Sequence, residues 1–413
     1  MTERKTENPG ISLCMIVKNE SKTIKRAIDS VRDIVNEIIV VDTGSKDNTS
    51  EIAKSLEAKV FSFTWCDDFS QARNFSLKQA SYSWILVLDA DETIAKRDLK
   101  EVLRVAHENT AEAAVFTQRN YCVYPDAEGW RANQNEYEEG AAYPGYFDVP
   151  IIRLFRNDPR IYFEGLVHEV VDNTVKGAKK RYPNVVIHHC GQLESQEVRN
   201  HKGSLYVALL QKQLERNPED STTWFLLGRQ YYTLGKFAEA IVFLRRVIAV
   251  GSKCEMAYDN LATAYVNSGM YEEARDILER LIELNPRYSE AYSTLGIVYY
   301  ELGFRDRSIN TLKHAINVSP RSFKPYFNLA VTFYREKNFT EAYLCIEQIE
   351  KIMTHFPRIY YLKFHILYEL FRLEEALSCA QRLKELDKRL YHNIKDKFNE
   401  IQSTLSFQKG VYH

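Results

Sequence analysis

Hydrophobic residues follow two different periods along this chain of 413 residues. Between residues 11 and about 120, continuous apolar runs alternate with stretches in which apolar residues recur every three or four positions. Continuous runs are typical of strands covered on both faces, and the second pattern is typical of amphipathic helices. From about residue 201 only the helical period remains. We therefore predict an α/β domain followed by an all-α domain.

The apolar runs of the first part predict four strands, at 11–17 (ISLCMIV), 37–42 (EIIVVD), 58–63 (AKVFSF) and 83–89 (SWILVLD). Amphipathic stretches predict helices between them, at 21–34, 46–56 and 69–80. Strands that alternate with helices imply crossover connections and a mainly parallel, Rossmann-like sheet. Ligands of such open sheets bind outside the carboxyl ends of the strands. Asp42 and Asp89 both fall at such ends.

Small residues and large aromatic residues each recur every 34 positions in the helical part. The small series is Ala240, Ala274, Ser308, Ala342 and Ala376, and the aromatic series is Trp224, Tyr258, Tyr292, Tyr326 and Tyr360. Small residues allow helices to approach, and this period and pattern resemble the tetratricopeptide repeat. A second series of small residues, Gly228, Ala262, Gly296 and Ala330, keeps the same step, and the fifth unit carries Phe364 at this position, which fits a terminal capping unit.

These patterns divide the chain into four expected parts. They are an α/β domain at 1–200, a linking helix at 201–220, about five repeats at 221–390 and a capping helix or tail at 391–413. Within the first domain, residues 121–150 show no clear period. We expect a loop there that acts as a lid or binds the acceptor, with a disordered surface insertion as the alternative.

Composition mainly excludes classes of partner and of location. A formal net charge of −1 provides no electrostatic footprint for nucleic acid. No apolar run is long enough for a signal core or a membrane span. The seven cysteines are scattered and form no Cys-x-x-Cys pair. We expect a reduced, cytoplasmic protein without a transmembrane segment.

The stretch LVLDADE places Asp89, Asp91 and Glu92 directly after an apolar run. Carboxylates held this close repel one another, so the cluster is costly unless a positive partner lies there. Mg²⁺ and Mn²⁺ favour carboxylate and water ligands, and either would be such a partner. A solvated acidic turn is the alternative. Two further residues near the predicted strand ends suit a nucleotide-sugar ligand. Asp42 could accept a hydrogen bond from uracil or ribose, and Arg73 could stack on a base or neutralise phosphate.

Four segments in this order are similar to the family 2 inverting glycosyltransferases, whose fold is usually called GT-A: ISLCMIVKNE, EIIVVDTGSKDNT, DFSQARN and WILVLDADE. The resemblance implies that Asp42 binds the nucleoside. It implies that Asp89 and Asp91 form the Asp-x-Asp pair of the family, with Asp91 as the direct metal ligand. Val17 and Glu20 would belong to the first loop on the nucleotide side. Ile16-Val17-Lys18 stands where many relatives have Pro-Thr-Tyr, so base contacts there are expected through the backbone.

An inverting transferase also needs a general base that takes a proton from the acceptor. The segment YFEGLVHEVV at 162–171 resembles the Val-His-Glu signature of this family's repeat-bearing branch. We assign Glu169 as the base, with His168 as its positional partner or a phosphate contact. Glu164 is the competing acid, and a surface strand with an ordinary ion pair is the alternative.

A late strand, NVVIHHCGQ at 184–192, ends in two histidines. Enzymes of this fold often use a late histidine as a further metal ligand, and His189 matches best. Imidazole favours Mn²⁺ over Mg²⁺. The rival interpretations are a zinc site made by His188, His189 and Cys190, and a histidine with no ligand role. Three adjacent residues do not easily face one ion, and no second Cys pair lies nearby.

Together these features predict a bacterial enzyme that transfers a hexose from a UDP-sugar to a hydroxyl or thiol acceptor. The fused repeats narrow the resemblance to a branch with lipopolysaccharide-core glucosyltransferases and sublancin-type peptide S-glycosyltransferases. The repeats would present a concave surface to a peptide or protein acceptor or to a second copy of the chain, and a saccharide acceptor remains open. The alternative is a non-catalytic tetratricopeptide adaptor with a relic domain. A nucleotidyltransferase ranks third, because VKNESKT has no glycine for a phosphate loop.

Overall fold

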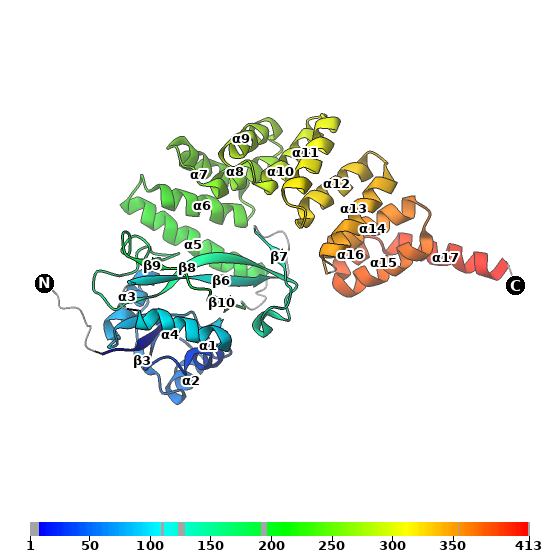
Figure 1. Ribbon diagram of the computed structural model, residues 1–413. Helices are drawn as coiled ribbons and strands as arrows, with labels where there is room; N and C mark the ends of the chain where they lie inside the picture. The colour runs from blue at the N-terminus through cyan, green and yellow to red at the C-terminus, as the bar shows by residue number, and fades with distance from the viewer. Residues whose placement is uncertain (1–7, 109–110, 123–128, 191–195, 354, 412–413) are drawn as a thin grey trace. The chain divides into compact units, whose positions relative to one another are not determined.

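A computed structural model describes residues 8–108, 111–122, 129–190, 196–353 and 355–411. The chain forms two compact units, Met1–Pro218 and Glu219–His413 (Figure 1). The first unit contains a ten-stranded sheet and the second is helical. The predicted fold class, a mainly parallel α/β domain followed by a helical repeat array, is confirmed.

Four parallel strands form one half of the sheet, in the order β3-β2-β1-β4. They are β1 (Ile11–Val17), β2 (Glu37–Asp42), β3 (Lys59–Ser62) and β4 (Trp84–Val87). All of β2 is buried, as its continuous apolar run predicts. Because these strands are parallel, their carboxyl ends meet at one edge of the sheet.

The other half of the sheet mixes strand directions. The long strand β8 (Gly145–Arg156) lies antiparallel between β4 and β6 (Ala113–Cys122). Beyond β6, β10 (Val186–His189) pairs parallel with β6 and antiparallel with β5 (Glu92–Ile94). The two-residue strands β7 (Arg131–Ala132) and β9 (Lys180–Arg181) pair with β8 and β6. The β5–β10 register sets His189 opposite Glu92 and so closes the sheet beside the acidic segment.

The segment at 121–150 is more regular than the expected loop. Its first residues continue β6, its last six begin β8, and β7 and the short 3₁₀ turn η2 (Glu138–Gly140) lie between them. The prediction of a loop was wrong for these residues, because their partners lie on the other strand, as in Tyr121 opposite Tyr146, and leave no period along the segment itself. Residues 123–128 of this segment lie outside the described residues.

Helices cover both faces of the sheet, so the sheet separates two hydrophobic cores. On one face α1 (Ile24–Val31), α2 (Thr49–Ser55) and α4 (Leu99–His107), the last preceded by the 3₁₀ turn η1 (Lys96–Asp98), pack on side chains such as Leu13 and Met15. On the other face α3 (Phe69–Gln79) packs on a cluster that includes Cys14. Neighbouring residues of β1 thus face opposite layers, as strand geometry requires. The last helix of this unit is α5 (Gln196–Arg216).

The second unit is a series of helix pairs. They are α6 (Ser221–Thr233) with α7 (Phe237–Ala249), α8 (Glu255–Asn267) with α9 (Tyr271–Leu284), α10 (Ser289–Glu301) with α11 (Arg305–Val318), α12 (Phe323–Arg335) with α13 (Phe339–Ile352), and α14 (Pro357–Glu369) with α15 (Leu373–Leu386). Two further helices follow, α16 (Lys388–His392) and α17 (Lys395–Val411). A Cβ atom on Gly296 would lie 2.5 Å from Cγ of Leu312, which explains the small residue at each helix crossing. In the fifth pair Phe364 fills this place and is fully buried, in a cluster that also contains Phe398 of α17.

Within the described ranges, we find no helix that is long and apolar enough to cross a membrane.

Candidate active site

Two buried arginines neutralise most of the acidic segment that follows β4. Asp89 is held between Arg73 and Arg153, with Nη2 of Arg153 donating to Oδ2 of Asp89 at 2.9 Å. The same Nη2 donates to Oε1 of Glu92 at 2.8 Å, and Glu92 is fully buried. Burial opposes the charge of Asp89, but the two guanidinium groups outweigh it and hold the pKa of this carboxyl well below its ordinary range. The protein thus supplies positive partners for two of the three acids.

The third acid, Asp91, pairs with the late histidine. Nε2 of His189 lies 3.0 Å from Oδ2 of Asp91, and Nδ1 lies 2.7 Å from Oδ1 of Asn120. Burial opposes the charge of His189, but the hydrogen bond and charge of Asp91, with Glu92 and Asp89 nearby, raise the pKa of His189 to about 9. About a third of each side chain is exposed, 31% for Asp91 and 33% for His189. A ligand can therefore reach this pair, unlike the buried Glu92.

The residues present suit a cation that is held partly by its substrate. Across the described residues, no group of three His, Cys, Asp or Glu side chains converges as a full metal cage. Asp91 provides one oxygen donor, and His189 would provide one nitrogen donor once the cation displaces its proton, both at an accessible place. Mg²⁺ and Mn²⁺ commonly take only one or two protein ligands when phosphate oxygens and water complete the shell. The donor set therefore fits a metal–diphosphate complex and does not fit an all-protein site.

Arg73 joins this cluster to the candidate base. Its Nε donates to Oε1 of Glu169 at 3.0 Å, while its Nη2 bonds Asp89. Arg73 is only 5% exposed, so its side chain lies inside the site as a bridge between carboxylates. Its Nη1 is buried and has no hydrogen-bond partner among the described residues. A buried donor without an acceptor in the protein can bond a water or a ligand oxygen.

The rest of the DFSQARN segment is explained by the same contacts. Asp68 caps α3 by accepting a hydrogen bond from the backbone N–H of Gln71. Asn74 makes two hydrogen bonds to the backbone of Phe163, at 2.8 and 2.9 Å. One turn of α3 therefore holds both the backbone and the carboxylate of the segment that carries Glu169.

The two candidate acids of this segment lie in different surroundings. Glu164 and Val170 pair as an antiparallel bridge, so residues 165–169 form the turn of a hairpin. Glu169 is 11% exposed and pairs with the buried Arg73. Glu164 instead accepts a hydrogen bond from the exposed Asn173, at 3.0 Å. The ring of His168 packs on Tyr206 of α5, at 5.4 Å between ring centroids.

The nucleotide-side loops meet at the same edge of the sheet. Asp42, which ends β2, accepts hydrogen bonds from the backbone of Gly44 and Ser45 and from the hydroxyl of Ser50. Burial opposes its charge, but these bonds outweigh burial and lower the pKa of Asp42 below its ordinary value. The carboxylate of Asp42 therefore stabilises the loop that follows β2.

The loop that follows β1 forms hydrogen bonds with the neighbouring loop and lies close to Asp89 and Asp91. The carbonyl oxygen of Val17 accepts from the N–H and hydroxyl of Thr43, at 3.0 and 3.1 Å. Burial raises the pKa of Glu20, and the carboxylates of Asp91 and Asp89 add to this effect. This coupling brings Glu20 into the same electrostatic cluster as the Asp-x-Asp pair.

The other histidine of the late strand, His188, lies in the protein interior. His188 is fully buried, and its Nδ1 lies 2.9 Å from the hydroxyl of Tyr121. Burial, with the charges of Arg119 and Arg97, lowers the pKa of His188 to about 3. Cys190 donates to the carbonyl of Glu139. Since neighbouring strand residues face opposite ways, His188 and His189 are not brought together, and the zinc alternative has no support from this geometry.

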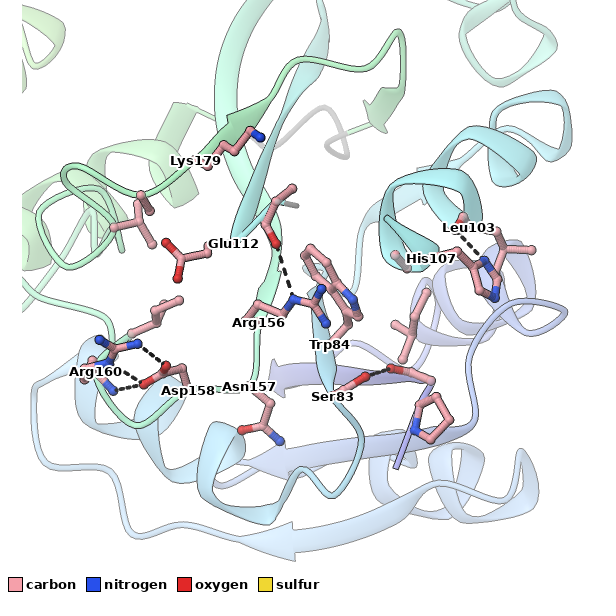
Figure 2. Close-up of a pocket in the computed structure, with 18 of the residues that line it drawn as sticks. Ser83, Trp84, Leu103, His107, Glu112, Arg156, Asn157, Asp158, Arg160 and Lys179 are labelled. Carbon is pink, nitrogen blue, oxygen red and sulfur yellow. Dashed lines mark hydrogen bonds and ion pairs between the residues drawn. The ribbon is translucent and has the colours of Figure 1, made fainter. Parts of the chain in front are cut away.

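A large cavity lies at the opposite, amino-terminal edge of the strands, and none of the candidate site residues lines it. It has a volume of about 1120 Å³ and is lined by the beginnings of β1 and β4 and the end of β8. Figure 2 shows Arg156 beside Trp84, with its guanidinium 4.2 Å from the ring centroid, and Arg160 paired with Asp158.

Sequence reasoning missed Arg153 and Asn120. Both lie on strands, β8 and β6, that reach the site from far along the chain. One signal for Arg153 was available, since it is the one charge inside the run VPIIRLF, and an arginine in such a run needs a paired anion. Asn120 carried no comparable signal.

Comparison with known proteins agrees with this architecture. Residues 12–161 match the family model of glycosyl transferase family 2. Residues 221–250 and 262–303 match two models of the tetratricopeptide repeat. The chain thus joins a family 2 glycosyl transferase domain to tetratricopeptide repeats, as the resemblance in the sequence implied.

The match to individual relatives covers only part of the length of each relative. SunS, an SPbeta prophage-derived glycosyltransferase of Bacillus subtilis, is 30% identical over 247 residues, which cover 59% of this chain and 54% of that protein. A TPR repeat-containing protein of Synechococcus elongatus is 37% identical over 177 residues, which cover 42% of this chain and 38% of that protein. An uncharacterized glycosyltransferase of Rickettsia bellii is 35% identical over 131 residues, which cover 27% and 44%. The chain therefore spans about half of these relatives or less.

Proposed function

We propose that this protein is an inverting hexosyltransferase that moves a sugar from a UDP-sugar to a hydroxyl or thiol acceptor and depends on Mg²⁺ or Mn²⁺. The observation that carries the proposal is the bridge made by Arg73, which ties Asp89 of the donor side to the candidate base Glu169. The glycosyltransferase name of SunS supports the same class of reaction.

The donor would bind along the carboxyl edge of β1, β2 and β4. The Asp42 loop and the Glu20 loop would form the nucleoside side, and Asp89 would lie beside the ribose. Asp91 and His189 would hold the cation, which when bound offsets the negative charge of the leaving diphosphate. The unpartnered Nη1 of Arg73 offers one more donor to an oxygen at this place.

In the proposed transfer step, a single side chain accepts the proton of the acceptor. Glu169 would take the proton of the acceptor O–H or S–H as that oxygen or sulfur bonds to the anomeric carbon. The bond between the anomeric carbon and the diphosphate oxygen breaks, UDP leaves with the electron pair, and the configuration inverts. Arg73 would orient the Glu169 carboxylate, and the small exposed fraction of Glu169, 11%, limits competing water.

The helical unit would recognise a peptide or protein acceptor. The first helices of successive pairs contact one another, so they line one common face. One position of these first helices recurs every 34 residues and is half-buried each time: Tyr232, Val266, Tyr300, Tyr334 and Tyr368. Rigid aromatic side chains that are partly exposed suit contacts with extended chains. A second copy of the chain is the other occupant that this face could accept. We place the protein in the cytoplasm, where its seven free cysteines would stay reduced.

The decisive experiment incubates the full chain with a panel of UDP-sugars, candidate peptides bearing Ser, Thr or Cys, and glycans. UDP release and the intact mass of each acceptor are measured with Mn²⁺, with Mg²⁺ and with EDTA. We expect one donor to add one sugar to one acceptor class, and EDTA to stop it. Absence of UDP binding and of turnover for every donor, with retained binding to a partner protein, would favour the adaptor instead.

A further inference from the structure

The hairpin that carries Glu169 has an unusual backbone at its turn. Gly165 has φ +105° and His168 has φ +55°, and the second value is in the left-handed region that non-glycine residues rarely adopt. Such conformations persist where the surroundings hold them in place. The hairpin therefore depends on external contacts for the position of Glu169.

Two helices supply those contacts through the peptide groups of Leu166. On one side, the carbonyl oxygen of Leu166 accepts from the backbone N–H of Phe69 in α3, at 2.9 Å. On the other, the backbone N–H of Leu166 donates to Oε1 of Gln213 in α5, at 2.9 Å. Leu166 is only 4% exposed, so water does not easily replace the Gln213 oxygen.

A second residue of α5 contacts the same turn through its ring. Tyr206 meets His168 edge to face, and it also meets Phe69, at 6.3 Å between ring centroids. Tyr206 and Gln213 are seven residues apart, which places them on one face of the helix. This face of α5 therefore contacts the hairpin at two residues, Leu166 and His168.

We propose that Gln213 and Tyr206 are positioning residues of the transferase, and that α5 sets the place from which Glu169 takes the acceptor proton. The inference rests on the proposed function, because it concerns the group assigned as base. Gln213 contacts the hairpin through the backbone of Leu166, and Tyr206 contacts it through the ring of His168, so we assign both effects to the position of the hairpin. Misplacing a reacting group by about 1 Å costs about a hundredfold in rate, so a lost backbone contact should be visible in turnover.

The test uses Gln213→Met in the full chain, which keeps the length of the side chain and removes the acceptor. We expect kcat to fall roughly tenfold to a hundredfold, while the KM of the donor and the affinity for UDP change less than twofold. Gln213→Glu retains an oxygen at the same place and should restore kcat. Gln211→Met, an exposed position on the same helix, is the matched control and should behave as the unaltered protein.

Three results would overturn the inference: an unchanged kcat in Gln213→Met, a rise in KM alone, or a Gln213→Glu variant as slow as Gln213→Met. If Gln213→Met does not fold at the assay temperature, Tyr206→Leu replaces it in the same test. A lower kcat with a nearly unchanged KM would support the inference, and an unchanged kcat would overturn it. Amide hydrogen exchange of residues 164–170 separates this inference from the proposed function. If no donor gives turnover, the proposed function fails. Faster exchange in Gln213→Met, and not in Gln211→Met, would still support the role of Gln213 in positioning the hairpin. Equal exchange in the two variants would reject that role.

Discussion

The two edges of the parallel strands hold charge in different ways. At the carboxyl edge, paired side chains come from distant parts of the chain, since Arg73 and Glu169 are 96 residues apart and Asp91 and His189 are 98 apart. At the amino edge, the cavity of about 1120 Å³ is lined by charges of another kind: Arg160 pairs with Asp158 two residues away, and Arg156 bonds backbone carbonyl oxygens. The cavity and the candidate catalytic residues thus lie at opposite ends of the same strands. The candidate site coincides with the buried ion pairs between distant segments, and not with the cavity.

The comparison predicts that Asp91→Asn has the largest effect. Asparagine keeps the shape and the hydrogen bond to His189 but loses the charge that a cation needs, so divalent-dependent turnover should disappear while the fold remains. UDP release measured against Mn²⁺ concentration, with thermal unfolding as the check on folding, tests this. Turnover that ignores both EDTA and this substitution would remove the metal role.

Glu169→Gln should lower transfer by roughly two or more orders of magnitude. UDP and metal binding should remain, because neither needs that carboxylate. Single-turnover rates and UDP titration measure the two effects separately. Glu164→Gln is the matched control on the same hairpin, and if it proves the damaging change while Glu169→Gln is mild, the wrong acid has been assigned.

Asn120→Ala should have a smaller effect on the same edge. Asn120 bonds Nδ1 of His189, and groups that orient a ligand histidine typically contribute about tenfold to a hundredfold in metal affinity. We expect the Mn²⁺ concentration for half-maximal turnover to rise about tenfold. Asn157→Ala provides the comparison at the amino edge, where Asn157 bonds two backbone carbonyls, and its Mn²⁺ requirement should not change.

Glu37→Gln should affect stability and leave transfer unchanged at pH 7. Burial opposes the charge of Glu37, but bonds from Lys59, Ser12 and Ser81 outweigh burial and lower the pKa of Glu37 to about 2. A lowered carboxyl pKa stabilises the fold above the unfolded pKa of about 4.5, and this stability is lost as pH falls toward 2.

Gln at this position should therefore cost about 1–3 kcal/mol of unfolding free energy at pH 7. The difference from the unaltered protein should shrink through the acid range. Denaturant unfolding at several pH values measures it. A pH-independent difference would mean that packing, and not the charge of Glu37, supplies the stability at this edge.

The first half of the sheet could be predicted almost to the residue. Strands β1 and β2 have the bounds that their apolar runs indicated, because a strand buried on both faces leaves a continuous signal. The helix expected at 46–56 is present as α2, although its N-cap residue, Asn48, makes no side-chain capping bond. Instead the backbone N–H of Thr49 donates to Asp47, at 3.1 Å.

The charge network could not be predicted in the same way. The acidic segment indicated a positive partner, but sequence spacing carries no information on which distant strand brings it. Arg153 reaches Asp89 only because β8 inserts beside β4, and Asn120 reaches His189 only through the pairing of β6 with β10. These are consequences of strand order, which a local pattern does not encode.

The place of β8 in the sheet also governs when the site can form during synthesis. It lies between β4 and β6, both of which leave the ribosome earlier, and β5 waits for β10, which ends at residue 189. A nascent chain of fewer than about 190 residues therefore has open strand edges, and the carboxylates of Asp89 and Glu92 lack Arg153 until β8 emerges. Unpaired edges favour aggregation, so this domain has a long vulnerable interval before its sheet closes. The repeats follow only after that interval has ended.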